Sequence, residues 1–272
     1  MEPGLVARGD LSEAVGRLSG DPRNWLVGLD FDGTLAAIVA RPEDAAVDRD
    51  LLPSLERLQR AVGTVAVISG RPRSFLDTQL PGVLALGSYG MELPPGFSHT
   101  GAPESFDGEA ALDQLAAARR SLLERLPQGT RLESKPYGVV LHYRGADAGF
   151  DQGRALELMA DVAREHHLEL VRGRLVIELK PYGPTDKGRA LAMLAERLEA
   201  SAVVFVGDDL GDIPAWEATR QMSERIPALS VGIASTEVPE EQMAICDLVL
   251  ADRVQLAALL DAVATRAELL TS

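Results

Sequence analysis

Two carboxylates, Asp30 and Asp32, stand two positions apart directly after the apolar run Trp25–Leu29. The run has the length and composition of a buried strand, and ligands bind at the carboxyl ends of strands in open α/β sheets. Two acids there repel each other and lose water, so they need a compensating cation, and hard oxygen ligands favour Mg²⁺. Gly33 permits unusual backbone angles and Thr34 offers a hydroxyl. The pattern predicts a metal-dependent site; the alternative is a strand ending in an Asp-Gly turn.

Three further polar clusters lie far away in the sequence but at comparable positions. Ser69 follows a second apolar run, Lys187 lies near a predicted helix start, and Asp208 and Asp212 follow another strand-like run. Parallel strands would bring these ends together, giving carboxylates for Mg²⁺ and a hydroxyl and an ammonium for an oxyanion. That inventory suits phosphoryl transfer. Taken singly, Ser69 could be a helix cap and Lys187 a solvated lysine.

The elements that must position these residues alternate between strand and helix. The helical stripe Asp50–Leu58 lies between apolar runs, and after residue 181 a helix and several strands follow again. This alternation predicts an α/β fold with a Rossmann-like, doubly wound parallel sheet. The runs read as core strands are Trp25–Leu29, Val62–Ile68, Val83–Leu86, Ala202–Val206, Val231–Ile233 and Leu248–Leu250.

The segment in between has a different pattern. Two predicted helices, Glu109–Leu126 and Asp151–His166, alternate with paired extended segments at Arg131–Arg144 and Leu168–Leu179. Antiparallel pairing there predicts an inserted α+β domain. The expected organisation is a lead-in at 1–20, a core at 21–104 and 181–272, and an insert at 105–180.

Four motifs appear in order: D-F-D-G-T, I-S-G-R, the Lys187 motif and G-D-D-L-G-D. Together they resemble the haloacid-dehalogenase-type phosphatase superfamily. The resemblance implies that Asp30 is a nucleophile that forms an aspartyl-phosphate, and that Asp32 is the general acid and then the base.

The same resemblance implies a Mg²⁺ site built by the Asp30 and Asp208 carboxylates and the Asp32 backbone carbonyl. Ser69 and Lys187 would hold phosphoryl oxygens. Asp212 would be a supporting carboxylate, and the role of its neighbour Asp209 stays open.

Longer stretches narrow the resemblance to trehalose-6-phosphate phosphatases, from Trp25 to about Asp252. They include G-S-Y-G-M-E-L, L-E-S-K through L-H-Y-R, and V-I-E-L-K-P-Y-G-P-T-D-K-G. The resemblance implies that the insert is a lid that selects a sugar phosphate. The implied substrate-binding residues are Arg71, Glu133, Lys135, His142, Arg144 and Glu178. Apart from the resemblance, the insert positions would read as a solvated sheet face with ion pairs.

Two departures bear on the substrate. Tyr89 stands where the family usually has a histidine, with Glu92 retained, and Gly211-Asp212-Ile213 departs from the usual end of the last motif. The alternatives are therefore a phosphatase of another sugar or glycoside phosphate (sucrose-, glucosylglycerol- or aminocyclitol-disaccharide phosphate) or an inactive sugar-phosphate-binding module. The complete catalytic motifs weigh against an inactive module.

The composition bounds the remaining classes. The 272 residues carry a net charge of −14, which argues against nucleic-acid or acidic-membrane partners. No run approaches the length of a membrane span, and the first residues lack the apolar core of a signal peptide. The single Cys246 fits a reducing compartment. We expect a cytoplasmic protein, with a monomer as the default.

Overall fold

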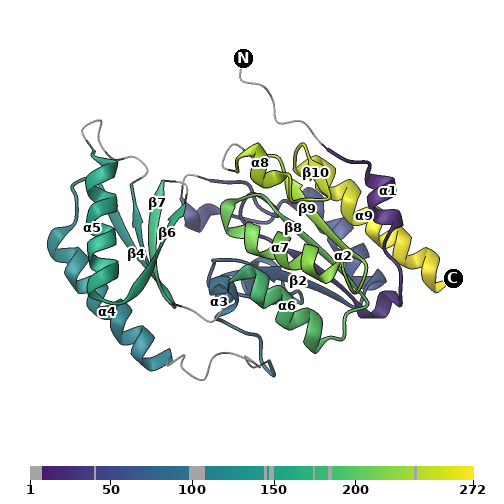
Figure 1. Cartoon of the computed structure of the whole chain (residues 1–272), viewed down its shortest axis with the longest axis horizontal. Coiled ribbons are helices and arrows are strands. Elements are labelled where there is room, and N and C mark those ends of the chain that lie inside the picture. Colours follow the sequence, from purple (N-terminus) through teal and green to yellow (C-terminus); the bar gives the residue numbers. More distant parts are fainter. Residues whose placement is uncertain are drawn as a thin grey trace, which may run out of the picture. The chain divides into compact units, whose positions relative to one another are not determined.

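The computed structural model describes residues 8–39, 41–97, 108–143, 146, 150–173, 175–182, 186–235 and 238–272. The chain divides into two compact units (Figure 1). The first is formed by Met1–Ser98 and Thr185–Ser272, and the second by His99–Pro184. The insert predicted at 105–180 falls within the span of the second unit.

The first unit is built on a parallel sheet, six-stranded within the described residues, in the order β10-β9-β8-β1-β2-β3. All strands of this sheet are short and mostly apolar, as expected where helices cover both faces. Its strands are β1 (Trp25–Leu29), β2 (Thr64–Ile68), β3 (Leu84–Leu86), β8 (Ala202–Gly207), β9 (Ala228–Ile233) and β10 (Leu248–Leu250).

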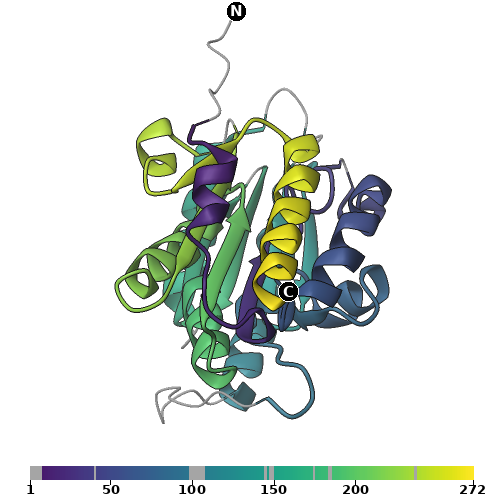
Figure 2. The ribbon, with the colours of Figure 1, turned by 90° about the vertical axis from the view of Figure 1, so that its right-hand side faces the viewer.

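Helices cover both faces of this sheet. One apolar core packs α1, α2, α3 and α9 against one face, and a second packs α6, α7 and α8 against the other. Figure 2 shows α1 and α9 side by side, and α1 buries Ala14 and Val15 in the first core. The helices are α1 (Leu11–Gly16), α2 (Leu52–Ala61), α3 (Arg73–Gln79), α6 (Lys187–Arg197), α7 (Ile213–Met222), α8 (Glu240–Met243) and α9 (Arg253–Thr271).

Short 3₁₀ helices fill several connections of the first unit. Two of them follow strands that matter for the site: η4 comes after β3, and η5 comes after β8. They are η1 (Pro22–Asn24), η2 (Pro42–Asp44), η3 (Arg49–Leu51), η4 (Ser88–Gly90) and η5 (Leu210–Asp212).

The second unit pairs an antiparallel sheet, in the order β4-β5-β7-β6, with two helices on one face. Apolar side chains of alternate strand residues face the helices, so the opposite face carries the polar ones. Its elements are α4 (Gly108–Arg125), β4 (Arg131–Lys135), β5 (Gly138–His142), α5 (Gln152–Glu165), β6 (Leu168–Gly173) and β7 (Val176–Pro181).

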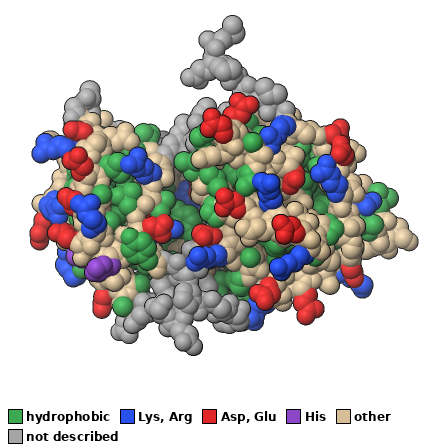
Figure 3. Space-filling view, viewed as in Figure 1, with side chains coloured by type: hydrophobic (Ala, Val, Ile, Leu, Met, Phe, Trp, Pro, Cys, Tyr) green, Lys and Arg blue, Asp and Glu red, His purple; other side chains and the backbone are tan. Residues whose placement is uncertain are grey.

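The predicted fold class is confirmed: a doubly wound parallel sheet and a separate α+β unit. None of the described helices is both long and apolar enough to cross a membrane. Over the face in Figure 3, Lys and Arg side chains are interspersed with Asp and Glu side chains.

Candidate active site

Three neighbouring strands deliver polar residues to one edge of the parallel sheet. In the order β8-β1-β2, Asp208 follows β8, Asp30 follows β1 and Ser69 follows β2. The backbone pairing continues past the strands, since the Asp30 amide donates to the Val206 carbonyl at 2.9 Å. The backbone therefore fixes where these side chains start.

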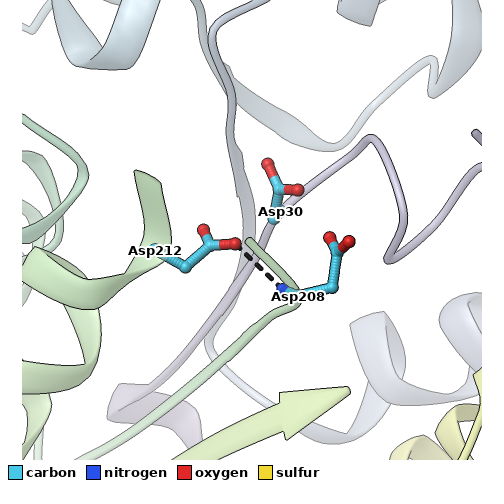
Figure 4. Close-up of side chains that lie close together, drawn as sticks. All are labelled: Asp30, Asp208 and Asp212. Carbon is cyan, nitrogen blue, oxygen red and sulfur yellow. Dashed lines mark hydrogen bonds between the residues drawn. The ribbon is translucent and has the colours of Figure 1, made fainter. Parts of the chain in front are cut away.

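Three buried carboxylates converge there (Figure 4). Oxygens of Asp30, Asp208 and Asp212 all lie within 4.8 Å of one another. Figure 4 draws Asp30 on the segment after β1, Asp208 at the end of β8 and Asp212 on the following turn. Carboxylate oxygens at this spacing could hold a metal ion.

Lys187 lies between two of these carboxylates. It is the first residue of α6, placed by the N-cap Asp186, and its side chain is only 3 % exposed. Its Nζ donates to Asp30 Oδ1 and to Asp212 Oδ1, each at 2.7 Å. The lysine supplies one positive charge to the group, which does not balance the negative charges of three ionised carboxylates.

Asp212 has hydrogen-bond partners on both of its oxygens. Oδ1 accepts from Lys187, and Oδ2 accepts from the backbone amides of Asp208 and Asp209 at 2.9 and 3.1 Å. Gly207 leaves the necessary space, because a Cβ there would lie 2.3 Å from Asp212 Cγ. Asp212 thus orients both the lysine and the loop that carries Asp208.

The pKa values show a shortage of positive charge. Burial, with the nearby acids, raises the pKa of Asp30 to about 8 despite Lys187. Burial and the neighbouring carboxylates Asp212 and Asp209 raise the pKa of Asp208 to about 8. Burial also raises the pKa of Asp212 well above its usual range. A divalent cation would relieve this repulsion, so the donor set fits a metal ion.

Burial disfavours the charged form of Lys187, but its acidic neighbours outweigh that effect. The carboxylates of Asp212, Asp30 and Asp209 raise the pKa of Lys187 well above its ordinary value. The side chain is therefore a fixed ammonium, able to face an anion.

The D-F-D-G-T turn packs directly on Asp208. Gly33 has a φ of +86°, and a Cβ there would lie 1.9 Å from Asp208 Oδ2. Thr34 Oγ1 donates to Asp208 Oδ1 at 3.3 Å. The glycine is required for both its backbone angle and the close approach.

Asp32 lies outside the group of three acids and pairs with Arg71. Its carboxylate accepts two bonds from the guanidinium, Nε to Oδ2 and Nη2 to Oδ1, both at 2.6 Å. The sequence predicted both residues for the site but not their contact.

The loop after β2 is held by the loop after β3. The Ser69 hydroxyl accepts from the Arg71 amide at 3.2 Å, and the Ser69 carbonyl accepts from the Tyr89 amide at 2.8 Å. Ser88 and Tyr89 both have left-handed backbones, with φ of 50° and 59°. The Tyr89 ring lies on Gly70, where a Cβ would come 2.6 Å from Tyr89 Cζ. The aromatic departure from the family pattern therefore lies beside the Ser69 loop.

The predicted substrate residues of the second unit form pairs on one face of its sheet. His142 Nε2 donates to Glu133 Oε2 at 2.6 Å, and Lys135 Nζ lies 3.2 Å from both Glu178 oxygens. Arg144 lies outside the described residues. These pairs form because β4 and β7 flank β5 in the observed register.

The predicted catalytic residues thus lie at one edge of the parallel sheet, where Asp32 pairs with Arg71 and lies outside the group of three acids. Asp212 lies beside Asp30 and Asp208, as expected of a supporting carboxylate. Sequence reasoning missed that Thr34 bonds Asp208 and that Glu133 bonds His142. No sequence pattern could have identified these two contacts.

The chain is similar to several known proteins. Residues 28–245 match the family model described as trehalose-phosphatase. The chain is 38% identical over 215 residues to an uncharacterized glycosyl hydrolase of Mycobacterium tuberculosis, covering 73% of this chain and 15% of that protein. It is 36% identical over 209 residues to the trehalose-phosphate phosphatase of Mycobacterium avium, covering 73% and 52%. The chain thus matches about half, or less, of the length of these relatives.

Among solved structures, the fold is similar to the C-terminal domain of the trehalose-6-phosphate phosphatase of C. albicans. The TM-score is 0.71 at 22% sequence identity, covering 94% of this chain and 95% of that one. This likeness concerns the fold.

Proposed function

Because the chain belongs to the trehalose-phosphatase family, we propose that it hydrolyses trehalose 6-phosphate to trehalose and phosphate. The observation that carries the proposal is the buried group of Asp30, Asp208 and Asp212 with Lys187 between them. Such a group can bind a cation and a phosphoryl group side by side.

In the proposed reaction, Asp30 is the nucleophile. Its carboxylate oxygen attacks phosphorus, the bond from phosphorus to the sugar oxygen breaks, and Asp32 gives that oxygen a proton. Asp32 then takes a proton from water as the water attacks the aspartyl-phosphate, which releases phosphate and restores Asp30. Ser69 and Lys187 hold phosphoryl oxygens throughout.

The proposed cofactor is Mg²⁺, held by Asp30, Asp208 and the Asp32 carbonyl. The support is the set of hard oxygen donors and the raised pKa of Asp30 and Asp208. When bound, a divalent ion supplies positive charge that offsets repulsion between the nucleophile and the phosphoryl oxygens. Asp212 is proposed to position Lys187 and the loop that carries Asp208, because its two oxygens already accept hydrogen bonds from Lys187 and two backbone amides.

Among the proposed sugar-binding residues, Glu133, Lys135, His142 and Glu178 lie on the polar face of the antiparallel sheet. Arg71 belongs to the first unit, and Arg144 lies outside the described residues. Charged partners suit a disaccharide phosphate, which presents many hydroxyl groups. The residues are Arg71, Glu133, Lys135, His142, Arg144 and Glu178. A second candidate, another glycoside phosphate, is favoured by Tyr89, which brings an aromatic ring beside the Ser69 loop.

The proposal includes a cytoplasmic location, a monomer, and no nucleic-acid or membrane partner. Its support is the net charge of −14 and the single cysteine, Cys246, which is buried.

The test is phosphate release from a panel of sugar phosphates and aryl phosphates, with Mg²⁺ and with EDTA. We expect Mg²⁺-dependent turnover with trehalose 6-phosphate preferred, and a loss of roughly three orders of magnitude or more in Asp30→Asn. Preference for a different glycoside phosphate would move the function to the second candidate. Release from no substrate at all would leave an inactive binding module.

A further inference from the structure

Asp32 and Arg71 form a two-bond pair at the edge of the site. The guanidinium presents Nε and Nη2 to the two carboxylate oxygens at 2.6 Å each, and the Arg71 side chain is only 14% exposed. We propose that Arg71 is a positioning residue that fixes the orientation of the Asp32 carboxylate for proton transfer. This rests on the proposed function, and it goes beyond a contact between Arg71 and substrate.

The guanidinium is itself held from two other directions. Arg71 Nη1 donates to the Pro42 carbonyl at 2.6 Å, and the guanidinium lies over the Phe75 ring, 4.7 Å from its centroid. Phe75 in turn meets the Phe31 ring edge-on, with centroids 5.5 Å apart. Phe31, which lies between Asp30 and Asp32 in the sequence, is fully buried. The arginine is therefore anchored to the same turn whose carboxylate it holds.

The backbone of Arg71 is fixed as well. Its amide donates to the Ser69 hydroxyl at 3.2 Å, and its carbonyl accepts from the Ser88 amide at 2.9 Å. The side chain consequently reaches Asp32 from a loop that is bonded at both ends. A planar guanidinium held by a fixed backbone makes two parallel hydrogen bonds and so imposes one orientation on a carboxylate, whereas a lysine ammonium does not.

Asp32 needs such a partner because burial does not restrain it. Its side chain is 38% exposed, in contrast to Asp30, Asp208 and Asp212. An aspartate in that setting samples several rotamers, whereas proton transfer requires the oxygen within hydrogen-bond reach of the leaving atom. Arg71 selects one of these rotamers.

A positioning role and a substrate contact predict different kinetics. A substrate contact acts on sugar phosphates and changes KM. Positioning of the acid acts on the chemical step, and its effect grows as the leaving group becomes more basic, because a poor leaving group needs the proton more.

The experiment compares kcat/KM for phenyl phosphate and p-nitrophenyl phosphate in Arg71→Gln. We expect a loss of roughly 10- to 100-fold for phenyl phosphate and less than about threefold for p-nitrophenyl phosphate. Arg71→Lys, which keeps the charge but not the fork, should stay impaired. Arg73→Gln is the matched control, since Arg73 pairs with Asp77 on α3 and should leave both rates unchanged.

A double-mutant cycle decides whether Arg71 acts through Asp32. In an Asp32→Asn background, measured on phenyl phosphate with concentrated enzyme, Arg71→Gln should cost less than about twofold. The same loss in both backgrounds, equal losses on both aryl phosphates, or full rescue by lysine would overturn the proposal. Circular dichroism of each variant establishes that it is folded.

Failure of the proposed function has a separate signature. In that case the wild-type chain would release phosphate from neither aryl phosphate nor any sugar phosphate. An active wild type with additive Arg71 and Asp32 losses would leave the phosphatase in place and remove only the positioning role.

Discussion

Gly33 occupies a position where any side chain would displace a carboxylate of the candidate site. It combines a left-handed φ of +86° with a Cβ direction that points at Asp208, 1.9 Å from Oδ2. Gly82 has nearly the same φ, +85°, but a Cβ there would meet nothing within 4 Å. Comparing substitutions at the two glycines therefore distinguishes the effect of backbone strain, present at both, from the effect of a Cβ colliding with Asp208, present only at Gly33.

We expect Gly82→Ala to lower the stability of the chain by about 1–2 kcal/mol and to keep its phosphatase activity. Gly33→Ala bears the same strain and must also move Asp208, so its Mg²⁺-dependent activity should fall at least about tenfold. Thermal melts and phosphate release measure the two effects. A fully active Gly33→Ala variant would mean that Asp208 has no essential role.

The residues that the sequence identified were those whose position in an element determines their environment. Asp30 and Asp208 end predicted strands, and Lys187 begins a predicted helix, so parallel topology alone brings them together. The pairing of Arg71 with Asp32 depends on side-chain rotamers of two loops, which no periodicity specifies.

At the scale of elements, the strands β4, β5 and β7 bring four charged or titratable side chains onto one face. Alternation in the sequence predicts that Glu133 and Lys135 share a face. The register, which pairs Glu133 with Val140 and Val140 with Glu178, decides that Glu133 meets His142 and Lys135 meets Glu178. Register depends on the intervening turn and was not predictable from residue types alone.

The Glu133–His142 bond should make the stability of the chain depend on pH. The hydrogen bond from His142 is the main reason that the pKa of Glu133 lies below its usual value of 4.5. A depressed pKa stabilises the fold above the unfolded-state pKa, and that stability is lost as pH falls through the folded-state pKa.

We therefore expect the melting temperature of the wild type to be higher than that of Glu133→Gln at about pH 6. The difference between the two melting temperatures should shrink by about pH 3. Melting curves across this range measure it. Glu157→Gln, at an exposed position of α5, is the control and should show a small, pH-independent difference. A melting-temperature difference between wild type and Glu133→Gln that stays constant with pH would mean that the hydrogen bond from His142 does not favour the ionised form of Glu133.

At the scale of the whole molecule, the chemical residues lie in the first unit and most of the proposed sugar-binding ones in the second. The resemblance to the trehalose-phosphatase family was stated from the motifs and is confirmed by the family model, which covers the whole second unit and most of the first. The order of strands and helices in the sequence predicted both units, because alternating strands and helices indicate a parallel sheet, whereas consecutive paired strands indicate an antiparallel one. It could not specify which glycoside fits, since that depends on side chains such as Tyr89.

The division predicts that the two units can be impaired separately. Glu178→Ala should lower kcat/KM for trehalose 6-phosphate roughly tenfold or more, because sugar hydroxyls lose a charged partner, and change p-nitrophenyl phosphate turnover by less than about twofold. Glu178→Gln, which keeps the volume of this buried side chain, should show the same selectivity. Both are measured by phosphate release.

The matched control is Glu169→Ala, which removes an acid that pairs with Lys180 across β6 and β7 at 3.4 Å. It lies outside the proposed sugar-binding set and should leave both rates unchanged. Equal losses of both activities in the Glu178 variants would count against a sugar contact.

The discontinuity of the first unit has a consequence for how the protein is made. β1 is flanked by β2, synthesised soon after it, and by β8, which emerges from the ribosome only after the whole second unit. Until then one edge of β1 remains unpaired, and Asp30 has neither Lys187 nor Asp208 beside it. A nascent chain therefore carries an exposed apolar edge and no assembled site until β8 pairs with β1, and this interval is its period of aggregation risk.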